Sequence, residues 1–551
     1  MPASYVFEIR SDLPALNGSI AKEWRNGPCR FQQVPMHGIY DLFSNACVGP
    51  AVLLSYGECC SQYRLRKGVP MRTAVSALLI LISLHLAAEA VPSSNPNVLF
   101  IISDDLTAEA LSCYGNVQSS TPNIDGLAEQ GVRFARAYSQ YPVCGPSRAA
   151  LMSGMYPQAI GVMGNGASSN FTKNLGDRPS FAGLFKQSGY YTARVSKIYH
   201  MRVPGDITAG VDGPDHLPSW TERFNCQGPE WMSSGEKGNL TNETLNFDPD
   251  KHYGLGFGGA FYVVKGDTDG AEQPDVQAAT KAIALLKSHH KAPFFLAVGL
   301  VRPHVPLVAP RAYFEPYTPA AMKLAPGIDG DWDDIPKAGI SKNSAGSGLE
   351  TDGSKQEVLS AYYASVAFMD AQVGRILAAL DELGLRENTI VVFTSDHGYH
   401  LGEHEFWQKM SLHEESIRIP VIIDAPGYAA AVTDSLAQQI DLYPTLATLA
   451  GLDVPDHCQG KSLVPAMATP GTVVHDAVYT CMDDAHALTT ARWSYIRYGD
   501  ESEELYDLSK DPRQFFNLAS VSAYREVVEG LRRRVSKKED SIPRIASATE
   551  R

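Results

Sequence analysis

The stretch NVLFIISDD, residues 97–105, is a continuous apolar run of strand length that ends in two aspartates. Such a run, bounded by polar residues, predicts a strand buried on both faces of a parallel sheet. The stretch TIVVFTSDHG, residues 389–398, repeats the pattern and ends in Asp396 and His397 before its glycine. Two strands that end in acidic residues predict one shared site at the edge of a sheet, where parallel α/β folds bind ligands.

Strands and helices alternate on either side of these two stretches. Apolar runs at residues 294–300 and 420–423 predict further strands, and helical patterns occupy residues 124–130, 147–153 and 276–288. This alternation predicts an α/β fold, in which helices cover both faces of a large, mainly parallel sheet.

The pattern changes after Gly451 to short strand-like pieces, followed by a helix from Ala523. The pieces lie at residues 477–480, 493–498 and 504–508. They predict a smaller C-terminal α+β domain with a short antiparallel sheet. Residues 204–236 and 326–353 are rich in Gly, Asp, Ser and Pro, which predicts long surface loops around the site.

The bulk composition is that of an ordinary globular protein, with 551 residues, 44% apolar and 20% charged, and a net charge of -14. The excess of acid argues against nucleic acid or an anionic membrane as the main partner, because both require a basic face. A local cationic pocket is compatible with this charge.

Residues 71–90 combine a basic start, an apolar run and Ala88-Glu89-Ala90 before Val91. This pattern predicts a secretory signal peptide, and its apolar run is shorter than the roughly 20 residues of a membrane span, so no stable membrane anchor is expected. We therefore expect a secreted or periplasmic protein, lysosomal in an animal cell. The expected parts are a misassigned or unassigned extension (1–70), the signal peptide (71–90), a catalytic domain (91–452) and a C-terminal subdomain (453–551). The alternative is a genuine N-terminal region followed by a buried helix or a membrane anchor.

Five of the nine cysteines follow the expected signal peptide: Cys113, Cys144, Cys226, Cys458 and Cys481. If Cys144 is used for chemistry, the other four either pair as disulfides in an oxidising compartment or remain free buried thiols.

Two groups of residues suggest chemistry. Cys144 begins the string CGPSR at the start of an expected helix, where backbone N–H groups favour anions. Asp104, Asp105 and Asp396 can converge at one edge only if a cation offsets their repulsion. Oxygen ligands favour calcium or magnesium, whereas His397 also suits manganese or zinc. The plain alternatives are a buried cysteine in a turn and acids that are solvated or cap helices.

The string C-x-P-S-R from Cys144 to Arg148 resembles the signature of the type I sulfatases, and residues 121–138, 373–404 and 504–512 resemble further stretches of that family. The resemblance implies the alkaline-phosphatase-like sulfatase fold and conversion of Cys144 to formylglycine, whose hydrated aldehyde attacks the ester while Arg148 holds it. It also implies one Ca²⁺ ion bound by Asp104, Asp105, Asp396, His397 and the modified Cys144. A formylglycine-generating or anaerobic sulfatase-maturing enzyme would then be a partner.

Four cationic or proton-transferring residues match the family by local motif: Lys197, His200, His304 and Lys409. The resemblance implies that Lys197 and Lys409 hold sulfate oxygens. It implies that His304 binds sulfate or protonates the leaving alcohol, and that His200 takes a proton from the second formylglycine hydroxyl. The segment VSKIYH departs from the family pattern G-K-x-x-H, since Ser196 replaces the glycine.

Within the family the sequence is most similar to iduronate-2-sulfatases, which implies a sulfated saccharide as substrate. Tyr399 and His400 depart from that group and are expected in loops that touch the sugar, and the C-terminal part is shorter. Arg302, His400 and Lys409 are candidates for binding a substrate carboxylate. The alternatives are choline sulfatase or another arylsulfatase-like or polysaccharide sulfatase acting on a small or polymeric sulfate ester, a phosphate or phosphonate monoester hydrolase, and a calcium-stabilised carbohydrate-binding protein without activity.

Overall fold

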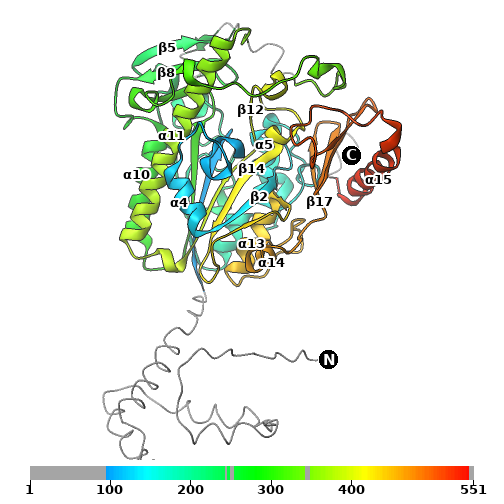
Figure 1. Cartoon of the computed structure of the whole chain (residues 1–551). Helices are drawn as coiled ribbons and strands as arrows, with labels where there is room; N and C mark the ends of the chain where they lie inside the picture. The colour runs from blue at the N-terminus through cyan, green and yellow to red at the C-terminus, as the bar shows by residue number, and fades with distance from the viewer. Residues whose placement is uncertain (1–94, 242–244, 249–252, 342–347, 545–551) are drawn as a thin grey trace, which may run out of the picture. The chain divides into compact units, whose positions relative to one another are not determined.

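The computed structural model describes residues 95–241, 245–248, 253–341 and 348–544 (Figure 1). A nine-stranded sheet runs through the main body. In spatial order its strands are β15 (Ala431–Thr433), β2 (Val132–Tyr138), β14 (Arg418–Asp424), β11 (Thr389–Ser395), β1 (Asn97–Asp104), β9 (Phe294–Pro303), β3 (Tyr191–Ser196) and β4 (Glu222–Phe224), with β16 (Ala437–Gln438) beside β2. The strands predicted from the apolar runs are therefore confirmed as neighbours in one sheet.

The sheet is mainly parallel. β1 pairs in parallel with both β11 and β9, and β3 continues the parallel arrangement on the far side of β9. β14 runs antiparallel to β11 and to β2, so one strand expected from its apolar run lies in the opposite direction to the central strands. The four parallel strands in the middle place their carboxyl ends at one edge.

Helices cover both faces of this sheet, as predicted (Figure 1). Val98, Phe100 and Ile102 of β1 pack into the core cluster on one face of the sheet, whereas Leu99 and Ile101 pack into the core cluster on the other face. This alternation follows from the two-residue period of a strand. The helices of the first face are α5 (Cys144–Ser153), α8 (Phe181–Gln187) and α13 (Leu442–Leu449); those of the second are α4 (Pro122–Gln130), α10 (Pro274–His289) and α11 (Asp352–Glu382).

The segment 204–236 is more structured than its composition predicts. It contains α9 (Gly205–Ala209) and the edge strand β4 of the main sheet, and it ends at the start of β5 (Gly235–Asn239). The expectation of a plain surface loop was wrong there, because β3 offers a free edge to which a short segment can add by backbone hydrogen bonds. Residues 326–341 contain only a 3-10 turn at Asp331–Asp333.

Three small sheets and several short helices complete the main body. The sheets are β10 (Leu307–Pro310) with β8 (Tyr262–Gly266) and β5, β6 (Asn246–Asp248) with β7 (Tyr253–Leu255), and β12 (His400–Leu401) with β13 (Trp407–Gln408). The short helices are α6 (Pro157–Ile160), α7 (Phe171–Leu175), α12 (Glu414–Ile417) and α14 (Val464–Ala468).

A four-stranded antiparallel sheet forms the smaller C-terminal part, as predicted. Its strands follow chain order: β17 (Ala477–Met482), β18 (Ala485–Thr490), β19 (Trp493–Arg497) and β20 (Glu503–Asp507), with α15 (Arg525–Ser541) after them. β18 was not predicted, because its sequence AHALTT lacks a clear apolar alternation.

Cys113, Cys144, Cys226, Cys458 and Cys481 are all free thiols, so the disulfide alternative does not hold among the described residues. Burial raises the pKa of Cys113, Cys226 and Cys458 to about 12, which keeps these thiols protonated and unreactive. The expected extension and signal peptide, residues 1–90, lie outside the described residues. In the described part of the chain, no helix is both long enough and apolar enough to cross a membrane.

Candidate active site

The acidic ends of β1 and β11 meet, as the sequence predicts. Ser103 pairs with Ser395 in the parallel register, so Asp104 and Asp105 emerge beside Asp396. One carboxylate oxygen from each of these three acids lies within 4.8 Å of the others, and all three residues are buried. Such a group of carboxylates out of water requires compensating cations.

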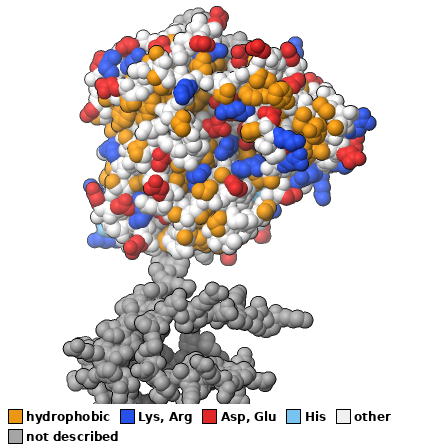
Figure 2. All heavy atoms as spheres, in the orientation of Figure 1, with side chains coloured by type: hydrophobic (Ala, Val, Ile, Leu, Met, Phe, Trp, Pro, Cys, Tyr) orange, Lys and Arg blue, Asp and Glu red, His pale blue; other side chains and the backbone are white. Residues whose placement is uncertain are grey.

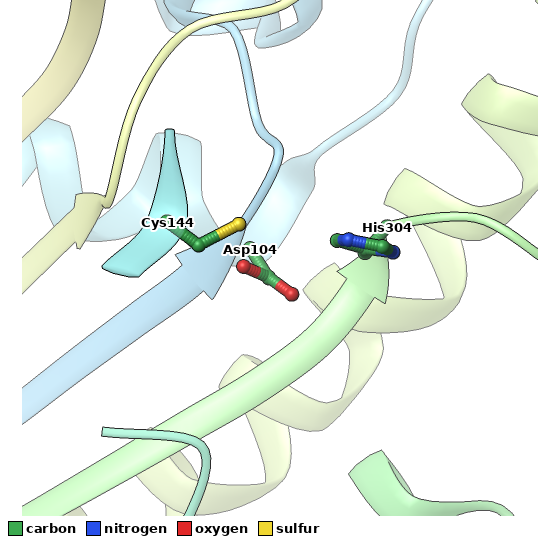
Figure 3. Close-up of side chains that lie close together, drawn as sticks. All are labelled: Asp104, Cys144 and His304. Carbon is green, nitrogen blue, oxygen red and sulfur yellow. The ribbon is translucent and has the colours of Figure 1, made fainter. Parts of the chain in front are cut away.

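Cys144 lies at the first position of α5 and joins this cluster. Its Sγ is 3.3 Å from Nε2 of His397, 3.7 Å from Oδ1 of Asp105 and 3.4 Å from Nζ of Lys409. Figure 3 shows Cys144 on one side of Asp104 and His304 on the other, each at the end of its own element. Residues from three distant parts of the sequence, at 104–105, 304 and 397–409, therefore surround one sulfur atom.

Arg148 lies one turn further along α5 and connects the two strand ends. Its Nε donates to Oδ2 of Asp396 at 2.8 Å, and Nη2 donates to Oδ1 of Asp104 at 3.2 Å. A third bond goes from Nη1 to the backbone oxygen of Lys197. The guanidinium is buried and fully used by these contacts, so it holds the strand ends and α5 in register.

Two lysines supply further positive charge. Nζ of Lys197 bonds to Oδ2 of Asp104, and Nζ of Lys409 bonds to Oδ1 of Asp105 at 2.5 Å. Lys197 follows β3, and Lys409 follows β13. Although burial lowers it, the neighbouring Asp105 raises the pKa of Lys409 above its usual range. Lys409 is therefore a permanent cation at the site.

His304 and His200 face the same cavity. Nδ1 of His304 lies 2.6 Å from the backbone oxygen of Val305, so that nitrogen carries hydrogen and Nε2 points to Asp105 at 3.7 Å. Burial lowers the pKa of His304 to about 4 and lowers the pKa of His200 well below its usual range. Both rings are thus neutral near pH 7 while no anion is bound.

An open cavity of about 620 Å³ lies over this cluster, with Cys144, Lys197, His200, His304 and Lys409 in its lining. Its outer wall contains Arg202 and several glycines, among them Gly258 and Gly259. A volume of this size accommodates a small organic ligand. The cationic and proton-transferring residues predicted from separate motifs therefore line one cavity together with Cys144.

The carboxylates are suited to a divalent cation. Oδ2 of Asp105 is buried and has no hydrogen-bond partner, which is costly unless a ligand or an ion completes it. Although burial raises it, Lys197 and other nearby cations hold the pKa of Asp104 well below its usual range, so this carboxyl is ionised. Several carboxylate oxygens that converge on one position are typical ligands of calcium or magnesium.

Several supporting residues were not predicted from the sequence. Nε2 of Gln439 donates to the backbone oxygens of Ser395 and Asp396 at 2.8 and 3.0 Å, and its Oε1 accepts from Ser147. The hydroxyl of Tyr362 donates to the backbone oxygen of Asp105 at 2.7 Å. Glutamine and tyrosine carry no motif of their own, so only their position in the fold identifies them.

Tyr399 and His400 do not lie in sugar-facing loops, and this expectation was wrong. Both are buried: Tyr399 stacks on Tyr362 with ring centroids 5.2 Å apart, and Nε2 of His400 bonds to Oγ of Ser411 at 2.6 Å. These residues follow β11 into the interior and not into a surface loop.

Arg302 is likewise unavailable as a ligand for a substrate carboxylate. It is buried, forms an ion pair with Glu230 and donates to the backbone oxygens of His304 and Pro306. Its guanidinium positions the segment that carries His304. Of the three candidates for that role, only Lys409 lines the cavity.

The fold and the site together define a hydrolase of the alkaline-phosphatase-like class. The family described as "Sulfatase" matches residues 96–452, and one described as "N-sulphoglucosamine sulphohydrolase, C-terminal" matches residues 402–541. A "Sulfatase" of Formosa agariphila is 32% identical over 457 residues, 79% of this chain and 85% of that protein. The "Iduronate 2-sulfatase" of Mus musculus is 32% identical over 435 residues, 71% of this chain and 76% of that protein.

Solved structures agree on the fold. A structure described in complex with its substrate D-glucosamine-2-N,6-O-disulfate has a TM-score of 0.63 at 21% identity and covers 81% of this chain and 98% of its own. The phosphonate monoester hydrolase of Agrobacterium radiobacter has a TM-score of 0.67 at 23% identity, with coverages of 81% and 96%. At these identities the likeness concerns the fold alone.

The chain belongs to the sulfatase family, whose members are hydrolases that act on sulfate esters. Its identity to the iduronate sulfatase equals its identity to the Formosa protein, so these comparisons do not single out one sulfate ester as the substrate.

Proposed function

We propose that this chain removes sulfate from a sulfated saccharide, with a specificity like that of iduronate-2-sulfatases, and that residue 144 acts as formylglycine beside a calcium ion. The observation that carries the proposal is the position of Cys144. Its Sγ lies between His397, Asp105 and Lys409 at the bottom of a cavity lined by further cationic side chains. Positive groups at that point offset the charge of a sulfate and of its transition state.

Asp104, Asp105, Asp396 and His397 are the residues that would hold the calcium ion, together with the modified side chain of residue 144. Support comes from the three converging carboxylates and from the buried Oδ2 of Asp105, which has no hydrogen-bond partner. A divalent ion there would act as a Lewis acid toward the sulfate oxygens. Arg148 already joins Asp104 to Asp396 and so preorganises two of these ligands.

The chain's own side chains then divide the reaction into two steps. A hydroxyl of the hydrated formylglycine would pass its proton to the neighbouring carboxylate of Asp105 and form a bond to sulfur. The bond from sulfur to the alcohol oxygen would break, and His304 would give that oxygen a proton. The second hydroxyl would then lose its proton to His200, its oxygen would form the C=O bond of the aldehyde, and the bond from the formylglycine carbon to the sulfated oxygen would break, so that sulfate leaves with that oxygen. Water restores the hydrated aldehyde.

Lys197 and Lys409 hold the sulfate oxygens in this scheme. Both ammonium groups reach the carboxylates next to Cys144, and a bound sulfate would share them. His304 is neutral without an anion, and a sulfate placed beside it favours the protonated ring, which is the form that donates. Binding of the sulfate thus favours the protonation of His304 that the first step requires.

A screen of defined sulfated disaccharides and small sulfate esters, read by released sulfate, tests this function. We expect a 2-O-sulfated uronic acid unit to have the highest kcat/KM and the matched phosphate ester to be much slower. Mass spectrometry of the peptide that contains residue 144 should find an aldehyde, and Cys144→Ala should lose turnover while remaining folded. Full activity of a protein in which Cys144 keeps its unmodified thiol, or full activity after complete chelation of calcium, would contradict the mechanism.

The proposal includes export and maturation of the chain. Residues 71–90 would direct export, and a formylglycine-generating or anaerobic sulfatase-maturing enzyme would act on Cys144. Sequencing the N-terminus of the mature protein tests the first part, with Val91 as the expected first residue. A mature chain that retains residues before Val91 would contradict it.

A further inference from the structure

A second cavity, which we call the basic pocket, lies where the C-terminal sheet meets the main body. It has a volume of about 360 Å³, and its cations are Lys461, Arg534, Lys537 and Lys538. Its lining comes from the turn before α6, from β16 and the loop before α14, from β17 and β18, and from α15. It shares no residue with the cavity above Cys144.

The charge of this pocket is opposite to that of the whole chain. Four Lys and Arg residues line it against one acid, Asp476, so its formal charge is 4 − 1 = +3, whereas the chain carries -14. Asp476 is already paired with Arg534 at 2.7 Å. Figure 2 shows Lys and Arg side chains gathered around α15 and the neighbouring C-terminal sheet. A local excess of positive charge on an acidic protein marks a place for an anion.

Asp441 is a buried acid near Lys538, but its oxygens have other hydrogen-bond partners. Asp441 accepts hydrogen bonds from the backbone N–H groups of Gln438 and Lys461, both at 2.7 Å, and from Nε2 of His475 at 2.8 Å. Its oxygens are therefore directed to the backbone and to the histidine. Among the described residues, neither Lys461 nor Lys538 forms an ion pair with a carboxylate, and Nζ of Lys461 donates instead to the backbone oxygen of Val474 at 3.2 Å.

The environment of Lys538 disfavours its positive charge. Its Nζ lies over the ring of Tyr156, 4.1 Å from the centroid. Burial first and the nearby Lys461 second lower the pKa of Lys538. A bound anion would offset both causes of the lowered pKa. Its negative charge would stabilise the buried ammonium group of Lys538 and would reduce the repulsion between Lys538 and Lys461.

We propose that the basic pocket binds a sulfate or carboxylate group on an anionic saccharide chain, as a second, non-catalytic site that holds the polymer on the enzyme. The aromatic wall at Tyr156 and the amides of Gln438 and Gln459 suit a sugar ring beside its anionic group. A concave pocket of this volume fits a small ligand unit, whereas a membrane or a nucleic acid duplex needs an extended surface. The choice of a sulfated saccharide as the anion rests on the proposed function.

The test compares two triple variants with the same change of net charge, both in a Cys144→Ala background so that bound chain is not hydrolysed. The pocket variant is K461Q/K537Q/K538Q, and the control is K173Q/K287Q/K291Q at exposed lysines outside the basic pocket. Affinity for heparin, a sulfated uronate-containing chain, is measured by calorimetry at fixed salt. We expect about tenfold or greater weakening in the pocket variant, since each charge-assisted contact is strong, and less than about twofold in the control.

The same substitutions with Cys144 intact should leave kcat/KM for a small aryl sulfate unchanged, because that substrate does not reach the basic pocket. Equal affinity of the pocket variant and the control for heparin would overturn the proposal. Displacement of heparin from the pocket by an equal concentration of inorganic sulfate would also overturn it, because the pocket would then be a site for the free ion. Absence of sulfate release from every sulfate ester tested, the sulfated disaccharides included, would instead refute the proposed function and leave the binding result standing.

Discussion

At the scale of single residues, backbone conformation explains a departure from the family pattern. Ser196, which replaces a glycine in the motif around Lys197, has a φ of 60°, in the left-handed region that glycine adopts at low cost. Its hydroxyl is buried and has no hydrogen-bond partner. The position therefore carries both backbone strain and an unsatisfied polar group.

Ser196→Gly should accordingly stabilise the protein by about 1 kcal/mol, because it removes the strained Cβ and the buried hydroxyl. Ser196→Ala removes only the hydroxyl and should gain less. Urea unfolding of the three proteins measures the difference. A larger gain for alanine than for glycine would show that backbone strain is not the cause.

Two adjacent tyrosines on α11 differ in whether their hydroxyl group contacts the active site. The hydroxyl of Tyr362 bonds to the backbone oxygen of Asp105, whereas that of Tyr363 accepts from the side chain of Asn116. Both side chains are buried. The pair therefore offers a matched experiment.

Tyr362→Phe should lower kcat/KM about tenfold, because Asp105 loses the contact that fixes its backbone. Tyr363→Phe should cost a similar 1 kcal/mol or so of stability but leave kcat/KM unchanged. Steady-state kinetics and thermal unfolding of both variants check this. Equal kinetic effects of the two substitutions would remove the positioning role of Tyr362.

At the scale of elements, one buried carboxylate connects two helices. Asp370 of α11 accepts from the backbone N–H groups of Ile124 at 2.8 Å and Asn123 at 3.2 Å, in the first turn of α4. It satisfies donors that a helix start leaves unpaired. Burial raises the pKa of Asp370 to about 6.

This raised pKa predicts a pH dependence of stability. The folded protein retains the Asp370 proton up to about pH 6, whereas the unfolded chain loses it near the ordinary aspartate pKa of 3.8. The contribution is thus fully present below that lower value and is lost as the pH rises through about 6. Relative to the wild type, Asp370→Asn should become more stable by up to about 3 kcal/mol between pH 4 and pH 7. Parallel unfolding curves of the two proteins at all pH values would contradict this.

At the scale of the whole molecule, the main body and the C-terminal sheet share a core. Tyr479, Leu488 and Leu505 of the small sheet belong to the same cluster of buried residues as Phe100 of the central strand. Glu504 adds a polar link, since its carboxylate accepts from Tyr498, Tyr506 and His413. The described residues between 95 and 544 form one compact unit in consequence.

The mature protein should therefore unfold in a single calorimetric transition, because neither part can keep its core without the other. A chain truncated after residue 452 should be insoluble or bind hydrophobic dyes, since it exposes the shared cluster. Two resolved transitions, or a folded truncated chain, would show that the expected boundary between 452 and 453 separates independent domains. Circular dichroism of the truncated chain provides that control.

The sequence by itself determined the alternating α/β class, the apolar strands β1, β9, β11 and β14, and the string at Cys144. It also predicted that Asp104, Asp105, Asp396 and His397 converge, but it missed β4 and β18. Apolar periodicity and short motifs are local properties, so they can be read without a structure. Tertiary structure alone decided that Tyr399, His400 and Arg302 are buried and that Gln439 and Tyr362 support the site. It also decided that four lysines and arginines from separate segments form the basic pocket. The physical reason is that burial and charge environment depend on which distant segments pack together.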